Sequence, residues 1–94
     1  MRLVWAPTAI RHLREAGGFI AQDNPDAADA LIARIAETAD SLALFPTSGR
    51  AAADGRRILS VPRTPFRLVY QLEGGIILIL AVWHGARAWP FDPR

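Results

Sequence analysis

Hydrophobic and polar residues alternate along one stretch in the second half of the chain, and an almost unbroken hydrophobic run follows it. Between residues 66 and 72 every second residue is hydrophobic, which is the period expected of a strand with one buried face. The run at residues 76–84 is hydrophobic on both faces, which is typical of a central strand. Gly74-Gly75 separates the two segments and is a favoured two-residue hairpin loop. This half of the chain therefore predicts an antiparallel hairpin inside a sheet.

The first quarter of the chain predicts a short strand followed by a helix. Residues 3–5 are hydrophobic, and Pro7 both stops the strand and suits the first turn of a helix. Gly17-Gly18 interrupts that helix at a cost of about 1 kcal/mol per glycine relative to Ala, so we expect a close helix–helix contact there. The hydrophobic residues that share one helical face are Ile10, Leu13 and Ile20.

A second helix is predicted to begin at Asn24-Pro25, because Asn is a good N-cap and Pro fits the first helical position. Its hydrophobic pattern continues to about Leu44, and Pro46 ends it. The few residues between the two helices predict an antiparallel helical hairpin. The residues expected on its buried face are Ala28, Leu31, Ile32, Ile35, Ala39 and Leu42.

Three strands are expected after the helices. Residues 46–55 have the composition of a loop. Residues 56–61 form the first strand, and the segment 62–65 breaks it before the two hairpin strands. The predicted fold class is α+β in the order β-α-α-β-β-β, with the helical hairpin packed on one face of a small, mainly antiparallel sheet.

The hairpin loop decides which residues share a face, because it pairs Glu73 with Ile76 and opposed residues lie on the same face. The face expected to carry the helices holds Phe66, Leu68, Tyr70 and Leu72 opposite Trp83, Ala81, Ile79 and Ile77. The other face holds Arg67, Val69 and Gln71 opposite Val82, Leu80 and Leu78, with His84 beside Arg67.

That second face is half hydrophobic, and the two helices do not cover it in the predicted arrangement. Exposed hydrophobic patches of this kind usually mark an interaction site. We therefore expect a protein partner to lie across it, on Val69, Leu78, Leu80 and Val82.

Composition places the chain among ordinary globular proteins, with 51% hydrophobic and 21% charged residues. Its 94 residues suffice for one domain, which we assign to residues 1–94. The absence of Cys excludes disulfides and Cys-based metal sites and fits a reducing cytoplasm. The longest hydrophobic run is far shorter than the roughly 20 residues of a membrane-spanning helix, so no membrane span is expected.

Charge is unevenly distributed along the chain. All eleven basic residues are Arg; residues 1–45 carry a formal charge of −2 and residues 46–94 one of +4. The basic half suits phosphate or an acidic protein, but a net charge of +2 is a weak signal for nucleic acid. We expect no direct DNA binding by this chain alone. His12 has no metal-ligand spacing, and neither a metal nor a cofactor is expected.

The order of these elements and several short segments resemble the ParE/RelE superfamily of bacterial toxins. Residues 66–70 (FRLVY) resemble the family's third strand, and residues 79–90 (ILAVWHGARAWP) are similar to the ParE ending, where His-Gly-Ala-Arg is followed by Trp. Pro46 and Gly49-Arg50 match the loop after the second helix. The resemblance spans nearly the whole chain and rests on the ordered set rather than on one segment.

The resemblance implies the toxin of a type II toxin–antitoxin pair, a system associated with plasmid stabilisation. A ParD-like antitoxin with a ribbon-helix-helix DNA-binding domain would neutralise it by wrapping its C-terminal segment around the toxin. ParE-like members inhibit DNA gyrase and have no known catalytic activity. On this interpretation the chain is a cytoplasmic gyrase inhibitor, and its expected surface contacts are Arg50, Arg67, Arg87 and Trp89.

The alternative is a RelE-like, metal-independent endonuclease that cleaves mRNA on the ribosome. Such cleavage needs a base for the 2′-hydroxyl, an acid for the leaving oxygen and cations for the developing charge. His84 suits the base or the acid, and Arg67 suits the phosphate. Arg57 or Arg87 would add charge.

The chain departs from the RelE-like pattern at several positions. RelE-like sites carry Lys or Glu bases, whereas this chain has no Lys and has Ala at residues 51–53 of the corresponding loop. Gly85 replaces a basic residue, and Trp89, Pro90 or Phe91 replaces the terminal Tyr. We therefore favour a binding protein over an enzyme; an inactive, antitoxin-binding member is a third possibility.

Overall fold

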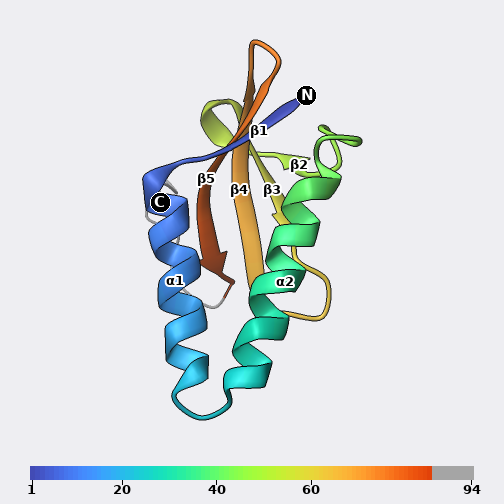
Figure 1. Cartoon of the computed structure of the whole chain (residues 1–94). Coiled ribbons are helices and arrows are strands. Elements are labelled where there is room, and N and C mark those ends of the chain that lie inside the picture. The colour runs from blue at the N-terminus through green and yellow to red at the C-terminus, as the bar shows by residue number, and fades with distance from the viewer. Residues whose placement is uncertain (86–94) are drawn as a thin grey trace.

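Two helices lie side by side over one face of a five-stranded sheet (Figure 1). The structure is a computed structural model, and it describes residues 1–85. The sheet order is β1-β5-β4-β3-β2, with β1 parallel to β5 and the other pairs antiparallel. This confirms the predicted α+β fold. The elements in chain order are β1 (Arg2–Trp5), α1 (Pro7–Ala21), α2 (Pro25–Ser41), β2 (Arg50–Ala51), the 3-10 turn η1 (Ala53–Gly55), β3 (Arg56–Ser60), β4 (Phe66–Glu73) and β5 (Ile76–His84).

Both helices begin at the predicted prolines. Asn24 caps α2 by accepting a hydrogen bond from a backbone N–H of the first turn at 3.0 Å, whereas Ala6 gives α1 no side-chain cap. The end of α2 is at Ser41 rather than near Leu44, because the N–H groups of residues 42–44 bond carbonyls three positions back and tighten the chain into turns. Neither helix of the described residues is long and apolar enough to cross a membrane.

The predicted helix–helix contact lies at Gly17 and not at Gly18. A Cβ atom on Gly17 would lie 2.6 Å from Cδ1 of Ile32 on α2, whereas a Cβ atom on Gly18 would meet nothing within 4 Å. Gly17 is buried and Gly18 is exposed. Only the first glycine is therefore required by the packing of the helices.

The core lies between the helix pair and the sheet. Its largest members on the sheet, such as Tyr70 and Ile77, are fully buried, and each contributes about 1.5–3 kcal/mol by leaving water. The buried residues of this cluster are Ala9, Leu31, Ile35, Ala39, Leu42, Val61, Leu68, Tyr70, Ile77, Ile79 and Val82.

The Gly-Gly loop reverses the chain between paired strands, as predicted. Both glycines have positive φ, 48° and 81°, which side chains disfavour. The loop pairs Glu73 with Ile76, and the predicted register holds as far as Tyr70 and Ile79. Local turn geometry therefore determines the first half of the hairpin.

A β-bulge changes the register of the second half of the hairpin. The pairing passes from Tyr70–Ile79 directly to Val69–Ala81, so Leu80 is an extra residue on β5. Because side chains alternate between faces, one extra residue exchanges the faces of all later residues on that strand.

The bulge makes four predicted face assignments wrong, those of Ala81, Val82, Trp83 and His84; Ala81, expected opposite Leu68, pairs with Val69 on the face away from the helices. Val82 was expected on the face away from the helices, but it pairs with Leu68 and joins the core at 4% exposure. Trp83 was expected in the core, but it pairs with Arg67 and is half-buried. A strand that is hydrophobic on both faces can bury either of its two alternating sets of side chains. The sequence pattern therefore does not reveal the shift in register.

α1 continues the sheet edge where β1 stops. β1 pairs with β5 only as far as Ile79. Beyond it the Val82 N–H donates to Nδ1 of His12 on α1 at 3.3 Å, and the His12 ring meets the Trp83 ring edge-on, with centroids 5.9 Å apart. The helix thus supplies an acceptor to a strand edge that would otherwise lack one.

The segment of residues 46–55, predicted to be a loop, contains β2 and η1. In β2, Arg50 pairs with Ile58 and Ala51 with Arg57. This strand was not predicted, because two residues carry no periodic pattern. Its pairing depends on β3 being in place.

Candidate partner-binding surface

The sheet face away from the helices brings together several of the predicted contact residues. Opposed residues share a face, and the register places Arg50, Ile58, Val69 and Ala81 in one row across four strands. The neighbouring rows on this face contain Ser60, Arg67 and Trp83 on one side, and Gln71 and Leu78 on the other. Val82 is absent from this face, as the bulge requires.

This face is not the continuous exposed hydrophobic patch that the sequence predicts. Arg50 and Arg67 are exposed, and Leu78 and Leu80 are half-buried. Val69 lies on the predicted face but is only 2% exposed. As a short side chain in a strand paired on both sides, it is easily shielded by longer neighbours. The exposed side chains of this face are therefore polar or charged, and Arg50 and Arg67 are among them.

Two further arginines on this face were missed by the sequence reasoning. Arg56 pairs with Gln71, and Arg2 pairs with Ile76. Arg56 also forms an ion pair with Asp54 at 3.5 Å, near the surface, where such pairs contribute little to stability. Side chains alternate between the two faces along residues 56–60. Pairing these residues with β4 of the hairpin would have placed Arg56 on this face, so this alternation was the signal in the sequence.

Arg67 and His84, which the nuclease alternative requires together, belong to opposite faces of the sheet. The bulge places His84 opposite Phe66, and their rings meet edge-on with centroids 5.3 Å apart. Arg67 is opposite Trp83 on the other face. The expected proximity of Arg67 and His84 on one face is therefore wrong.

The neighbours of Arg57 differ from those of Arg67 and of His84. It pairs with Tyr70, and its Nη1 donates to the Gly49 carbonyl at 2.8 Å and to the Thr47 carbonyl at 3.4 Å. Its guanidinium thus holds the segment after α2. The other predicted contacts, Arg87 and Trp89, lie outside the described residues.

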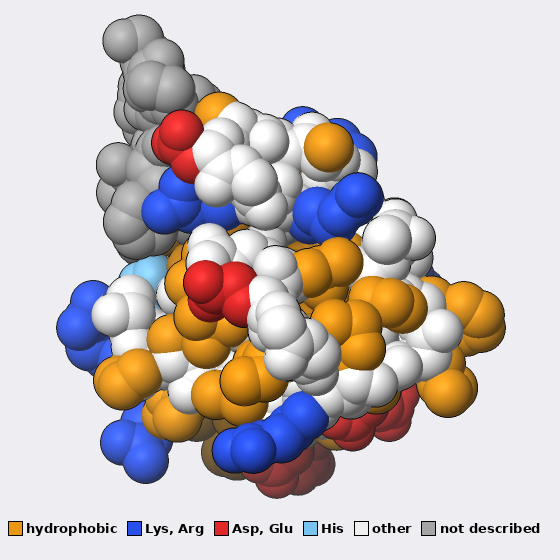
Figure 2. Space-filling view, turned by 90° about the horizontal axis from the view of Figure 1, so that it is seen from above, with side chains coloured by type: hydrophobic (Ala, Val, Ile, Leu, Met, Phe, Trp, Pro, Cys, Tyr) orange, Lys and Arg blue, Asp and Glu red, His pale blue; other side chains and the backbone are white. Residues whose placement is uncertain are grey.

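Exposed hydrophobic side chains occur outside this face of the sheet. Seen from the end at which the β4–β5 hairpin turns, hydrophobic side chains form much of the surface, with arginines around them (Figure 2). Leu44 and Phe45, just after α2, are 77% and 65% exposed, and Phe19 on α1 is 75% exposed. Within residues 1–85, no three His, Asp or Glu side chains are grouped so as to hold a metal ion.

Sequence comparison finds one family over almost the whole chain. The profile of the family described as "ParE toxin of type II toxin-antitoxin system, parDE" matches residues 3–89. Y4kP, a presumed toxin of Sinorhizobium fredii, is 37% identical over 90 residues, which are 95% of this chain and 93% of the relative. Toxin RelE2 of Caulobacter vibrioides is 34% identical over 87 residues, which are 92% of this chain and 97% of the relative.

Structural comparison gives a consistent result. The solved structure titled "Chromosomal ParDE TA system from P. aeruginosa" superposes with a TM-score of 0.81 at 25% sequence identity. The match covers 89% of this chain and 95% of that one. The helix pair on a mixed five-stranded sheet is therefore shared with a protein from such a system.

Proposed function

Because this chain belongs to the family of ParE toxins of type II toxin–antitoxin systems, we propose that it inhibits DNA gyrase and that a ParD-like antitoxin neutralises it. The observation that carries this proposal is the separation of Arg67 from His84 by the sheet. General acid–base cleavage of RNA needs proton-transfer groups and cations directed at one phosphate. Their separation favours a toxin that acts by binding.

Gyrase inhibition would use the arginine-rich face. Arg50 and Arg67 are exposed there, and Leu78 and Leu80 add half-buried hydrophobic surface. Arg87 and Trp89 remain proposed contacts. Arginine and large side chains are common anchors of protein interfaces, and such a toxin would act in the cytoplasm, where gyrase is.

A supercoiling assay tests the first part of the proposal. Purified chain added to gyrase and relaxed plasmid is expected to abolish supercoiling, whereas mRNA on ribosomes given the same chain should remain whole. An unaffected gyrase would contradict the proposal.

The runner-up is a RelE-like ribonuclease, which the likeness to Toxin RelE2 favours. On that alternative, mRNA on the ribosome acquires cuts. Cuts that disappear in His84→Ala would overturn the ranking, even though Arg67 lies on the other face.

The antitoxin part has its own test. A short reading frame beside the toxin gene should encode a ribbon-helix-helix protein that co-purifies with this chain. The complex should shift operator DNA in a gel, whereas the toxin alone should not, because its net charge is only +2. A DNA shift by the isolated toxin would contradict this division of roles.

A further inference from the structure

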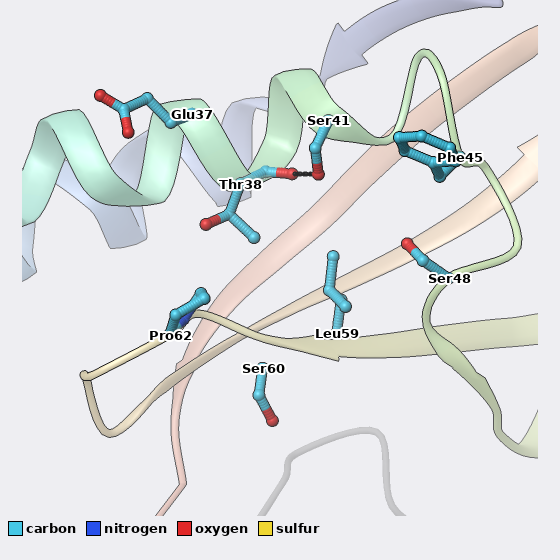
Figure 3. Close-up of a pocket in the computed structure, with 8 residues that line it drawn as sticks. All are labelled: Glu37, Thr38, Ser41, Phe45, Ser48, Leu59, Ser60 and Pro62. Carbon is cyan, nitrogen blue, oxygen red and sulfur yellow. Dashed lines mark hydrogen bonds between the residues drawn. The ribbon is translucent and has the colours of Figure 1, made fainter.

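Residues 46–49, the connecting segment, join the turns after α2 to β2. Figure 3 shows Phe45 and Ser48 on this part of the chain as it leads from α2 to the sheet. Arg50, a proposed contact for gyrase, follows the segment directly and is exposed. β2 contains only Arg50 and Ala51, far fewer than the roughly 5–6 residues of an average strand. Its pairing alone therefore restrains Arg50 weakly.

Two side chains from β3 and β4 bind the backbone of the connecting segment. Arg57 and Tyr70 are opposite each other and share the helix-facing side of the sheet. Nη1 of Arg57 donates to the carbonyls of Gly49 at 2.8 Å and of Thr47 at 3.4 Å. The Tyr70 hydroxyl donates to the Pro46 carbonyl and accepts the Gly49 N–H. The two side chains therefore restrain the segment along its whole length.

The guanidinium of Arg57 serves as a donor to the backbone. The side chain is half-buried, and no carboxylate among residues 1–85 forms an ion pair with it. A guanidinium carries only donors, so it suits carbonyl groups that a two-residue strand leaves without ladder bonds. Arg50 pairs with Ile58 on the face away from the helices. The two arginines therefore lie on opposite faces of the same sheet edge.

We propose that Arg57 is a positioning residue for gyrase inhibition. It holds the connecting segment from the helix side of the sheet and thereby places Arg50 on the opposite face, where Arg50 contacts the partner. Arg57 itself does not touch gyrase. A contact residue whose backbone is held before binding loses less conformational freedom in the complex. The inference rests on the proposed function, since Arg50 is a gyrase contact only there.

Double-mutant cycles in the supercoiling assay test this assignment. Arg57→Met keeps the hydrophobic part of the side chain and removes its donors, and it should raise the concentration needed to inhibit gyrase at least about threefold. Because Arg57 acts through Arg50, adding Arg57→Met to Arg50→Ala should raise that concentration by no more than about 1.5-fold. Added to Arg67→Ala, it should have its full effect, because Arg67 lies opposite Trp83 and not on the edge strand.

Arg14→Met is the matched control, because it also removes one positive charge, from an exposed position on α1. It should leave inhibition unchanged. Equal inhibition by Arg57→Met and Arg14→Met overturns the inference. A full additional loss on the Arg50→Ala background overturns it too, since Arg57 would then contact gyrase itself. A wild-type chain that leaves gyrase active overturns the proposed function instead.

Hydrogen exchange followed by NMR tests the positioning without gyrase. The amides of Gly49 and Ala52 flank Arg50, and both are hydrogen-bonded. In Arg57→Met both should exchange at least about tenfold faster than in the wild type. The Val61 amide, which bonds to β4 just beyond β3, is the internal control and should keep its rate. Unchanged exchange at Gly49 and Ala52 overturns the inference, as does equal acceleration at all three amides, which would indicate general destabilisation.

Tyr70→Phe provides a second test that changes no charge. Tyr70 is fully buried, so it does not contact a partner, but its hydroxyl binds the same segment. The variant should raise the inhibitory concentration at least about twofold, and this effect should also be lost on the Arg50→Ala background. Circular dichroism checks that both variants fold, and Tyr70→Phe decides if Arg57→Met does not. A folded Tyr70→Phe protein with wild-type inhibition overturns the inference.

Discussion

Tyr70 holds the segment after α2 against the sheet with a single hydroxyl group. Its side chain is fully buried, and the hydroxyl donates to the Pro46 carbonyl at 2.8 Å while accepting the Gly49 N–H at 2.9 Å. A Cβ atom at position 49 would lie 2.7 Å from that hydroxyl oxygen. The packed tyrosine therefore requires glycine at this point of the loop.

Tyr70→Phe should lower the free energy of unfolding by about 1–2 kcal/mol, because the Gly49 N–H loses a buried partner. Gly49→Ala should also destabilise, because the added methyl group displaces the tyrosine ring. Urea unfolding followed by circular dichroism measures both changes. Wild-type stability of Tyr70→Phe would mean that water satisfies the N–H instead.

At the scale of elements, the helical hairpin depends on one of two adjacent glycines. Gly17 is pressed against Ile32, whereas Gly18 faces open space. Both glycines reduce helix propensity equally. The difference in stability between the Ala variants at these two positions therefore measures the packing of α1 on α2.

Gly18→Ala should raise the free energy of unfolding by about 0.5–1 kcal/mol through helix propensity alone. Gly17→Ala gains the same propensity but must displace the end of Ile32, so it should be less stable than Gly18→Ala by at least about 0.5 kcal/mol. Paired urea titrations measure the difference. Equal gains at the two positions would show that Ile32 adopts another rotamer without loss.

The β-bulge is the second feature at this scale, and Val82 distinguishes its register from a regular one, with Val4 as a control whose pairing lies before the bulge. Val82 is in the core, whereas Val4 is half-buried and pairs with Leu78 on the other face. Val82→Thr should lower the free energy of unfolding by about 1–2 kcal/mol, because it buries a hydroxyl group without an arranged partner. Val4→Thr should change it by less than about 0.5 kcal/mol. A loss at Val82 as small as that at Val4 would favour the unbulged pairing.

At the scale of the whole molecule, the two layers differ in charge. The helical part, residues 7–41, has three Arg and six acidic residues, a formal −3. Residues 50–85, which contain most of the sheet, have five Arg and two acidic residues, a formal +3. An acidic partner is therefore attracted to the sheet side, and salt should weaken that attraction.

Charge reversal on the two sides tests this with the same change in net charge in both variants. The double variant Arg50→Glu with Arg67→Glu should raise the concentration needed to inhibit gyrase at least about tenfold. The double variant Arg11→Glu with Arg14→Glu, on exposed positions of α1, changes the net charge equally and should have little effect. The supercoiling assay gives both values. Equal losses would mean that only total charge matters.

Much of the fold could be predicted because its signals are local. Pro7 and Pro25 mark the starts of the helices, and the Gly-Gly loop determines the hairpin register next to it. The close contact at Gly17 followed from the cost of glycine inside a helix. The two-residue strand β2 could not be predicted, because its pairing exists only once β3 is in place.

The candidate site was harder to predict, because it depends on register far from the turn. Arg67 and Leu78 lie on the expected face, whereas Val82 and His84 are exchanged to the other. No polar residue between Ile76 and Trp83 marks the shift.

By itself, the sequence determined the helices, the hairpin and the order of the elements, because caps, prolines, glycines and hydrophobic periods act over a few residues. The tertiary structure alone decided the bulge at Leu80, and with it which side of β5 faces the helices. The physical reason is that a strand hydrophobic on both faces has two similar ways to bury itself. Packing against Leu68, α1 and α2 selects one of them.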